Sequence, residues 1–290
     1  MEFLNEQEIR ALLPVRPEDS HKGTFGRVVI AGGQYGMAGA PLLAARAALR
    51  CGVGLAEVAV PREIYPILAG ALPEAIYTPL PASCEGRLEE AALPWLQKRL
   101  VDASALVLGC GMGQSSGVKA LVRGLLKETT CPLVLDADGI NAVDRHILSS
   151  EERCAPRILT PHPGEMARLC GCTVREVQAD RAGMAAALSK ACGAVVVLKG
   201  HHTLIAEPDG SLRCNPTGNS GMATGGSGDV LAGMIGSLLA QGMAPGDAAC
   251  CGVYLHGLAG DRAAVRVSRT ALLPSDIIEE LCRLFADWER

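Results

Sequence analysis

Aromatic side chains and runs of positive charge are scarce in this sequence. Trp, Tyr and Phe make up 3% of the 290 residues, and 27 Lys and Arg against 31 Asp and Glu give a formal charge of -4 at pH 7. Proteins that bind single strands of nucleic acid stack bases on aromatic rings, and those that bind duplexes neutralise phosphates with Lys and Arg. The composition therefore predicts no polynucleotide partner.

Signals for disulfides, export and membrane insertion are also missing. The 12 cysteines are scattered and contain no Cys-x-x-Cys pair, which is typical of a reduced cytoplasmic protein rather than a disulfide or zinc framework. The amino end lacks the basic start and apolar run of a signal peptide. The uncharged stretch at residues 230–246 is short for a membrane span and contains Pro245. We expect a cytoplasmic protein that does not enter the membrane.

No linker, low-complexity tract or internal repeat divides the chain. A chain of this length buries roughly 75% of its unfolded surface, which is enough for one large core. We therefore expect a single domain over residues 1–290.

Short runs rich in Val, Ile and Leu alternate with Ala- and Leu-rich segments of helical length. The runs predict buried strands at residues 27–31, 56–60, 105–108, 133–135, 157–159 and 195–198, and the segments predict helices at residues 40–50, 118–126, 175–191, 230–241, 247–263 and 274–288. Pro208-Asp209-Gly210 predicts a hairpin turn between strands at residues 204–206 and 212–215. This alternation predicts an α/β fold with a mainly parallel sheet.

Many of the 34 glycines gather just after predicted strands, where parallel sheets bind their ligands. Glycine loops at residues 32–40 and 109–113 follow the first and third strands. Neither loop has the GxGxxG spacing of a dinucleotide site, and the chain has no Gly-Lys dipeptide for a P-loop.

The strongest local pattern is Thr224-Gly225-Gly226-Ser227-Gly228-Asp229, directly before an apolar helix. Glycines let several N–H groups point at one spot, and a helix amino end adds positive partial charge there, so the turn predicts an anion site. Asp229 is then either a helix-capping acid or a base beside a transferred phosphoryl group. The pattern alone leaves both roles open.

Two polar segments follow later strands. After the sixth strand come Lys199, Gly200, His201, His202 and Thr203, which place a cation and a hydroxyl where a nucleotide could bind. After the fifth strand comes His162, between two prolines that restrict the backbone. Taken singly, Lys199 is as well explained as a solvated strand end, and His162 as a turn histidine held by local hydrogen bonds.

One further motif indicates a hydrolase. Gly113-Gln114-Ser115-Ser116-Gly117 matches GxSxG, and Asp136 or Asp138 and then His162 follow in the chain order of an α/β-hydrolase. That motif needs the serine directly at a strand-to-helix turn, whereas here residues 109–113 intervene. We therefore disfavour a hydrolase.

Four segments together resemble the ribokinase-like NAD(P)H-hydrate dehydratases, the ADP- or ATP-dependent enzymes that repair hydrated nicotinamide cofactors. The similarity runs from His21 to the last helices, and its segments are His21-Lys22-Gly23-Thr24-Phe25-Gly26, Gly36-Met37-Ala38-Gly39-Ala40, Leu159-Thr160-Pro161-His162-Pro163-Gly164-Glu165 and residues 215–229. The resemblance implies a three-layer α/β/α sandwich with a mainly parallel central sheet. Many relatives carry an epimerase domain, for which we expect no room in this chain.

The implied reaction phosphorylates the hydroxyl next to the ring nitrogen of the S epimer of hydrated NADH or NADPH, and then eliminates phosphate. ADP or ATP, accompanied by Mg²⁺, is the expected phosphoryl donor. In such an enzyme Asp229 is the base, and Gly226, Ser227 and Gly228 stabilise the transferred group. By the same resemblance, the hydrate would contact Ala40, Gly113, His162 and Asp229, and the nucleotide would contact Lys199, Gly200, His201, His202, Thr203 and Gly228.

The resemblance also implies a homo-oligomer, with a tetramer as one option, and a separate epimerase that interconverts the hydrate epimers. Cys110 stands where relatives usually have Pro. The choices between ADP and ATP and between NADH and NADPH stay open. Two other functions remain as alternatives, namely a kinase for small vitamin alcohols and a nucleotide sensor that has lost its chemistry.

Overall fold

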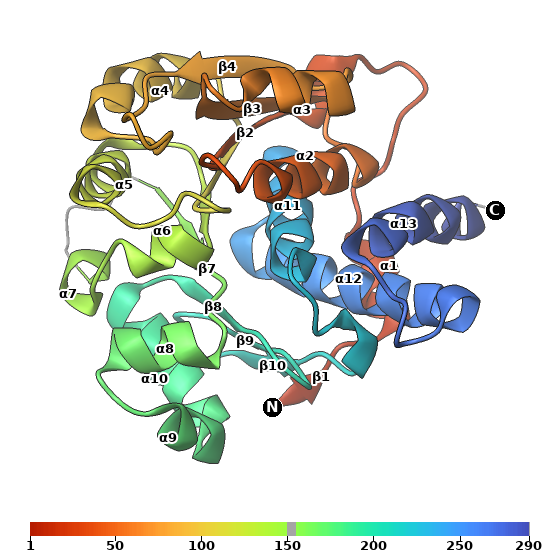
Figure 1. Ribbon diagram of the computed structural model, residues 1–290. Helices are drawn as coiled ribbons and strands as arrows, with labels where there is room; N and C mark the ends of the chain where they lie inside the picture. The colour runs from red at the N-terminus through yellow and green to blue at the C-terminus, as the bar shows by residue number, and fades with distance from the viewer. Residues whose placement is uncertain (150–154, 290) are drawn as a thin grey trace.

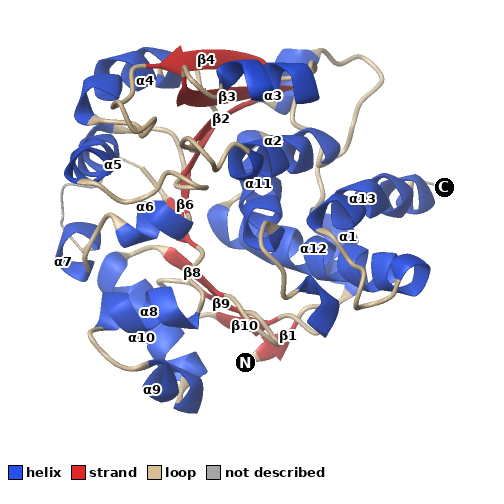
Figure 2. Cartoon of the chain, viewed as in Figure 1, coloured by secondary structure: helices blue, strands red, loops and turns tan. Residues whose placement is uncertain are grey.

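The centre of the computed structural model is one sheet of ten strands, and the structure describes residues 1–149 and 155–289. The strands lie in the order β1-β10-β9-β8-β7-β6-β5-β2-β3-β4 (Figure 2). Their bounds are β1 (Glu2–Phe3), β2 (Arg27–Ala31), β3 (Leu55–Pro61), β4 (Ile76–Leu80), β5 (Ala105–Leu108), β6 (Leu133–Leu135), β7 (Arg157–Leu159), β8 (Val195–Leu198), β9 (Leu204–Ala206) and β10 (Leu212–Cys214).

The predicted sheet is confirmed. Strands β2, β5, β6, β7 and β8 have the predicted bounds, and β3 is one residue longer at each end. All strands run in one direction except β9, which pairs antiparallel with β8 and β10 and so confirms the predicted hairpin. The sequence patterns missed β1 and β4. Strand β4 lies at the edge of the sheet, half exposed and with a Pro in it, so it has no buried apolar run to detect.

Helices cover both faces of the sheet and complete three layers (Figure 1). One face is covered by α1 (Glu6–Leu12), α2 (Gly39–Arg50), α3 (Tyr65–Ala71), α11 (Ser227–Ala240), α12 (Pro245–Val267) and α13 (Pro274–Trp288). The other face is covered by α4 (Leu93–Leu100), α5 (Ser116–Glu128), α6 (Ala137–Asn141), α7 (Arg145–Leu148), α8 (Pro163–Cys170), α9 (Val174–Ala179) and α10 (Arg181–Cys192). Within the described part of the chain, no helix is long and apolar enough to cross a membrane.

Two separate apolar cores follow from the two-residue period of the strands. In β2, Val28 and Ile30 pack on the side of α2 and α11, whereas Val29 and Ala31 pack on the side of α5. Because both faces are covered, the central strands read as continuous apolar runs instead of alternating patterns.

The helix predicted over residues 175–191 is wrong as a single element. The structure has α9 and α10 there, separated by Asp180, whose φ of -142° and ψ of 65° interrupt the helix. The Asp180 side chain accepts the Gly183 N–H at 2.9 Å and so caps α10. Apolar residues occur on both sides of the break because α9 and α10 pack on the same face of the sheet.

The core helix α11 fixes the position of the predicted anion turn. It packs so closely on α2 that a Cβ on Gly233 would lie 2.1 Å from the Ala44 carbonyl oxygen. From Val230 to Ala240 every residue of α11 is buried. A helix held this firmly gives the residues at its amino end a fixed place at the edge of the sheet.

Candidate functional site

Loops that follow five neighbouring strands meet at the carboxyl edge of the sheet. Strand β2 pairs with both β3 and β5, so the chain order changes direction between β2 and β5. The loops after these two strands are joined by a hydrogen bond of 2.8 Å from the Gly33 N–H to the Cys110 carbonyl. Ligands of open α/β sheets bind at such a switch point.

The predicted anion turn begins α11 at this edge. Gly226 is the residue before the helix and has a φ of +96°, where an added Cβ would lie 2.6 Å from the Leu43 Cδ1 atom. No side-chain oxygen caps α11, and at its first residue the Ser227 N–H donates to the Thr224 carbonyl at 3.3 Å. Ser227 and Gly228 line the cavity described below, so this end of the helix can hold an anion.

Asp229 lies in the first turn of α11, beside Cys110 and Asp136. One ligand atom of each of these three residues lies within 4.8 Å of the other two. Burial and then the neighbouring Asp136 raise the pKa of Asp229 to about 6, although Cys110 and Lys199 oppose the shift. A carboxylate that titrates near neutral pH is suited to accept a proton, which favours the catalytic role over a simple cap.

A buried ion pair lies next to Asp229. The Lys199 ammonium donates to the Asp136 Oδ1 atom at 2.7 Å, and the Thr160 hydroxyl donates to the same oxygen at 2.6 Å. Burial alone would lower the pKa of Lys199, but Asp136 and Glu165 raise it above its usual value, so Lys199 stays charged. A Cβ on Gly228 would lie 3.4 Å from the Lys199 Nζ atom, which places the cation against the anion turn.

His162 and Glu165 form a reciprocal cap at the start of α8. The His162 Nδ1 atom accepts the Gly164 N–H at 3.0 Å, and the Glu165 Oε2 atom accepts the His162 N–H at 2.7 Å. Burial and then Lys199 lower the pKa of His162, so its ring is neutral at physiological pH. Burial raises the pKa of Glu165 to about 7. His162 is thus held by local hydrogen bonds, as one interpretation predicted, and it also lines the cavity.

The loop of residues 199–203 is shaped by its backbone. Gly200 and His202 have φ values of +140° and +54°. The Thr203 hydroxyl donates to the Gly200 carbonyl at 3.0 Å, and the Arg181 guanidinium donates to the Leu198 carbonyl at 3.1 Å. All five predicted residues of this loop line one cavity.

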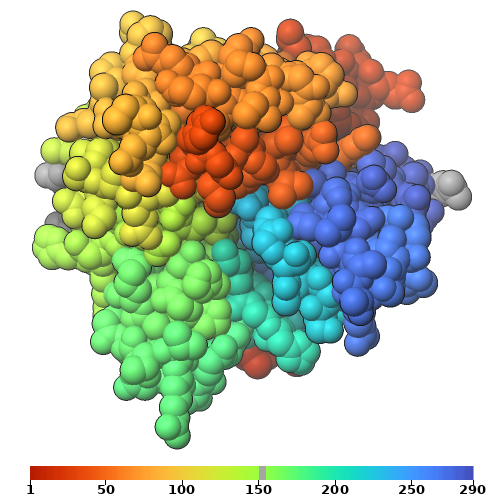
Figure 3. Space-filling view, viewed as in Figure 1, coloured from red at the N-terminus to blue at the C-terminus, as the bar shows by residue number. Residues whose placement is uncertain are grey.

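This cavity has a volume of about 740 Å³. Its wall comes from segments coloured green, teal, cyan and blue, which meet on the face seen in Figure 3. The residues that line it are His162, Pro163, Lys199, Gly200, His201, His202, Thr203, Asn215, Thr217, Gly218, Asn219, Ser220, Met222, Ala223, Thr224, Gly225, Ser227, Gly228, Leu231, Val253, His256 and Gly257. Lys199 is the one Lys or Arg among the described residues of this wall, so it is the fixed positive charge available to an anion.

Ala40 and Gly113 lie outside this cavity, on the side of the two glycine loops. A Cβ on Gly111 would lie 2.8 Å from the Ala40 Cβ atom, so the two loops touch. The Gly113 N–H donates to the Asp138 Oδ2 atom at 2.8 Å. The Asp229 carboxylate lies beside Cys110 of the second glycine loop, whereas Gly228 lines the cavity. Of the residues predicted for the hydrate, Ala40 and Gly113 therefore lie at the glycine loops, whereas His162 lines the cavity together with the residues predicted for the nucleotide.

Cys110 is fully buried between these groups. Burial, with Asp229 and Asp136 nearby, raises the pKa of its thiol well above the usual value. A protonated thiol is neither a nucleophile nor a metal ligand. Cys110 therefore contributes packing to the loop.

The structure also explains the GxSxG match. The Ser115 Oγ atom accepts the Val118 N–H at 3.1 Å and caps α5. Asp136 is paired with Lys199, and the His162 Nδ1 atom accepts a backbone N–H at the start of α8. These residues serve other partners and do not form a hydrolase triad.

Sequence reasoning missed four residues of this site, and a usable signal existed for the first three. Asp136, Thr160 and Glu165 follow buried strands at the ligand-binding edge, where polar residues carry most weight. His256 gave no such signal because it lies inside the long, mostly buried helix α12.

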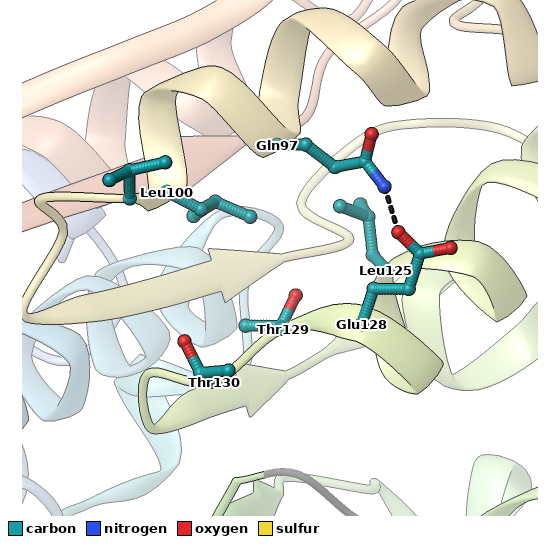
Figure 4. A pocket seen from close by; sticks show the side chains of 7 residues that line it. Gln97, Leu100, Leu125, Glu128, Thr129 and Thr130 are labelled. Atoms are coloured by element: carbon teal, nitrogen blue, oxygen red, sulfur yellow. Dashed lines mark hydrogen bonds between the residues drawn. The ribbon is translucent and has the colours of Figure 1, made fainter.

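A smaller hollow of about 240 Å³ lies elsewhere (Figure 4). It is lined by Gln97, Leu100, Val101, Leu125, Glu128, Thr129 and Thr130, which precede β5 and β6 in the chain. A hydrogen bond joins the Gln97 and Glu128 side chains there. Its described lining includes no Lys, Arg or His and lies at the amino edge of the sheet, so it shares nothing with the candidate site.

Comparison with known proteins adds independent information. A family model described as NAD(P)H-hydrate dehydratase matches residues 28–283. The ADP-dependent (S)-NAD(P)H-hydrate dehydratase of Neisseria meningitidis is 46% identical over 251 residues, which cover 85% of this chain and 80% of that protein. The bifunctional NAD(P)H-hydrate repair enzyme Nnr of Moorella thermoacetica is 45% identical over 274 residues, which cover 94% of this chain and 51% of that protein. The chain thus spans about half the length of the bifunctional relative.

The fold has close counterparts among solved structures. A crystal structure of the ADP/ATP-dependent NAD(P)H-hydrate dehydratase from Bacillus subtilis, co-crystallised with ATP and Mg²⁺, superposes with a TM-score of 0.86. The two chains are 35% identical, and the match covers 99% of this chain and 98% of the other.

Proposed function

The chain belongs to the NAD(P)H-hydrate dehydratase family, and from this we propose that it dehydrates the S epimer of hydrated NADH or NADPH at the expense of ADP or ATP. The products are NADH or NADPH, inorganic phosphate, and AMP or ADP. Relatives with this reaction in their names support the proposal, as does the ribokinase-like three-layer fold.

The observation that carries the proposal is the position of Asp229. Its carboxylate, with a pKa raised to about 6, lies beside Cys110 of the second glycine loop and beside Asp136, which pairs with the Lys199 ammonium in the cavity wall. Phosphoryl transfer needs a donor site and an acceptor site on either side of a base and a set of anion-binding groups. This arrangement supplies both sites.

In the first step, Asp229 accepts the proton of the substrate hydroxyl as its oxygen bonds to the terminal phosphorus of the nucleotide. The bond to the bridging oxygen breaks, and AMP or ADP leaves with that electron pair. The N–H groups of Gly226, Ser227 and Gly228 and the Lys199 ammonium stabilise the negative charge on the transferred group. Gly200, His201, His202 and Thr203 hold the rest of the nucleotide.

In the second step, the lone pair of the ring nitrogen expels phosphate, and loss of a proton from the neighbouring carbon restores the dihydropyridine. His162 takes part in binding rather than in this proton transfer. Its Nδ1 lone pair accepts backbone N–H groups of α8, so the neutral ring carries its proton on Nε2 and offers the hydrate a donor.

The residues present fit a Mg²⁺ ion that accompanies the nucleotide. Magnesium is usually bound by one or two carboxylates together with phosphate oxygens and water. Asp136 is the carboxylate that would hold it, and its Oδ2 atom lies 3.9 Å from where a Gly228 Cβ would be. When bound, the ion would neutralise phosphate charge.

The test is direct. The purified chain is incubated with hydrated NADH and ADP, and the near-ultraviolet absorbance of the dihydropyridine is followed, with AMP and phosphate measured in parallel. We expect recovery of the absorbance with one AMP and one phosphate per NADH. Phosphorylation of a vitamin alcohol without any recovery would instead establish the kinase alternative, and nucleotide binding without either reaction would establish the sensor.

The rate of this reaction should fall as the pH is lowered through about 6, because Asp229 accepts a proton only as the carboxylate. An unperturbed aspartate would keep its activity down to about pH 4. In Asp136→Asn the neighbouring negative charge is gone, so the acid limb should move to lower pH even though the maximal rate also falls. The measurement is kcat/KM against pH, corrected for the reaction without enzyme, and an acid limb that stays unmoved in Asp136→Asn would contradict the assignment.

Three further features belong to the same proposal. A single domain over residues 1–290 is supported by the unbroken ten-stranded sheet. A homo-oligomer is supported by exposed Tyr65, Ile67 and Ile76 beside the edge strand β4, and light scattering gives its mass. Action in the cytoplasm is supported by the free cysteines, and action beside an epimerase activity by relatives named as bifunctional repair enzymes.

A further inference from the structure

The long helix α12 lies against the anion turn, and its His256 has no part in the mechanism above. His256 and Ser227 are 9% and 7% exposed, and both line the cavity. The His256 Nε2 atom lies 3.3 Å from the Ser227 Oγ atom. A buried imidazole thus lies beside the Ser227 hydroxyl of the anion turn.

The ring of His256 is uncharged throughout the physiological range. Burial is the main cause that lowers its pKa to about 4, and the Lys199 charge acts in the same direction. A hydrogen bond with the Ser227 main chain opposes the shift. A neutral imidazole carries its one proton on either Nδ1 or Nε2, and with the proton on Nε2 the nitrogen that faces Ser227 is a donor.

From this geometry we infer that His256 is a positioning residue for phosphoryl transfer. Its Nε2–H donates to the Ser227 Oγ atom, which leaves the hydroxyl proton of Ser227 free to point at the transferred group. This inference rests on the proposed function, since it assigns a task in that reaction.

A serine hydroxyl needs such a partner because it rotates freely. Donors stabilise a transition state best when they already point at the developing charge, so that no energy is spent on turning them. The N-cap residue Gly226 has no side chain that could hold the hydroxyl. His256 supplies the missing constraint from a different helix.

The rest of α12 holds the neighbouring loop in place. The Thr217 hydroxyl donates to the Tyr254 carbonyl at 3.0 Å, and the Gly218 N–H donates to the Asp261 Oδ2 atom at 2.8 Å. The Asn219 side chain donates to the Gly260 carbonyl at 3.0 Å. Because α12 is fixed to the loop on both sides of His256, the imidazole has a defined place from which to orient Ser227.

A double-mutant cycle tests the inference. Ser227→Ala should lower kcat about 100-fold and His256→Ala about 10-fold, since loss of a whole donor costs more than loss of its orientation. The double variant should be no slower than Ser227→Ala, because His256 acts through that hydroxyl. His256→Gln keeps an N–H donor near the position of Nε2 and should recover most of the rate. The KM for ADP should change little in all four variants.

Two control variants separate positioning from folding. Ser237→Ala removes the other buried serine of α11, which binds the Val53 N–H, and His146→Ala removes an exposed histidine of α7. Both should leave kcat unchanged. If His256→Ala and Ser227→Ala multiply their effects, or if His256→Ala raises KM at constant kcat, then His256 is a nucleotide contact and the inference is wrong.

Binding of AMP together with inorganic phosphate keeps this test independent of the reaction. The gain in thermal midpoint should be smaller in Ser227→Ala and His256→Ala than in wild type, and no smaller in the double variant than in Ser227→Ala. This pattern without any dehydration by wild type would overturn the proposed function and leave the inference standing. Dehydration by wild type, together with His256 variants that react at the full wild-type rate, would support the proposed function and overturn the inference.

Discussion

Asp229→Asn is expected to bind AMP as well as wild type and to dehydrate hydrated NADH at least roughly 100-fold more slowly. The amide has the shape of the carboxylate but cannot accept a proton from the substrate hydroxyl. Nucleotide binding should survive because the cavity is lined by Gly228 and residues 199–203, not by the Asp229 side chain. Calorimetric titration with AMP and the absorbance assay measure the two effects on one sample.

The same variant should be more stable than wild type. Because burial raises the pKa of Asp229 above its usual value, the charged carboxylate destabilises the folded protein at neutral pH, and this penalty shrinks as the pH falls below the folded-state pKa of about 6 and is gone only below the unfolded-state pKa. Asparagine removes the charge and also its repulsion by Asp136. A higher thermal midpoint with lost activity is typical of a strained functional group.

Asp209→Asn provides the matched control. Asp209 lies in the exposed turn between β9 and β10, where its side chain accepts the Ser211 N–H. The same change of side chain there should leave turnover unaltered. An Asp229→Asn enzyme that keeps the wild-type rate would exclude Asp229 as the base and return it to the role of a helix cap.

The strands of the sheet were predictable because burial on both faces leaves an unbroken apolar run in each. The anion turn was predictable because glycine spacing and a following helix are local features. Edge strand β4 was not, since half of its residues face solvent and Pro79 interrupts it. The break at Asp180 was missed because residues with good helix propensity, chiefly Ala and Arg, lie on both sides of it.

The site itself was predictable only where single segments carry a signal. Asp136 becomes important because Lys199, 63 residues later, reaches it across the intervening strand β7. Ser227 meets His256 through the packing of α11 on α12, 29 residues apart. Contacts of this kind depend on tertiary packing, so no periodicity or spacing in the sequence predicts them. The sequence allowed Lys199 to be a solvated cation at the end of a strand, whereas in the structure it is the centre of a buried network.

Lys199→Met should lower kcat about 100-fold and raise the KM for ADP, because the fixed cation of the cavity is lost. It should also destabilise the fold by about 3 kcal/mol, since the Asp136 carboxylate is left buried without its partner. The acid limb of kcat/KM should move to higher pH, because Lys199 holds the pKa of Asp229 down. Urea unfolding and the pH profile measure these effects separately.

The double variant Lys199→Met with Asp136→Asn decides between catalysis and folding. Removal of both charges at once should restore most of the lost stability, because a neutral pair has no unpaired charge to bury. Activity should not return, since no cation then faces the transferred group. Lys190→Met on the exposed side of α10 should leave rate and stability as they are. If activity rose together with stability in the double variant, Lys199 would be a structural lysine, and the charge that the phosphoryl group needs would have to come from elsewhere.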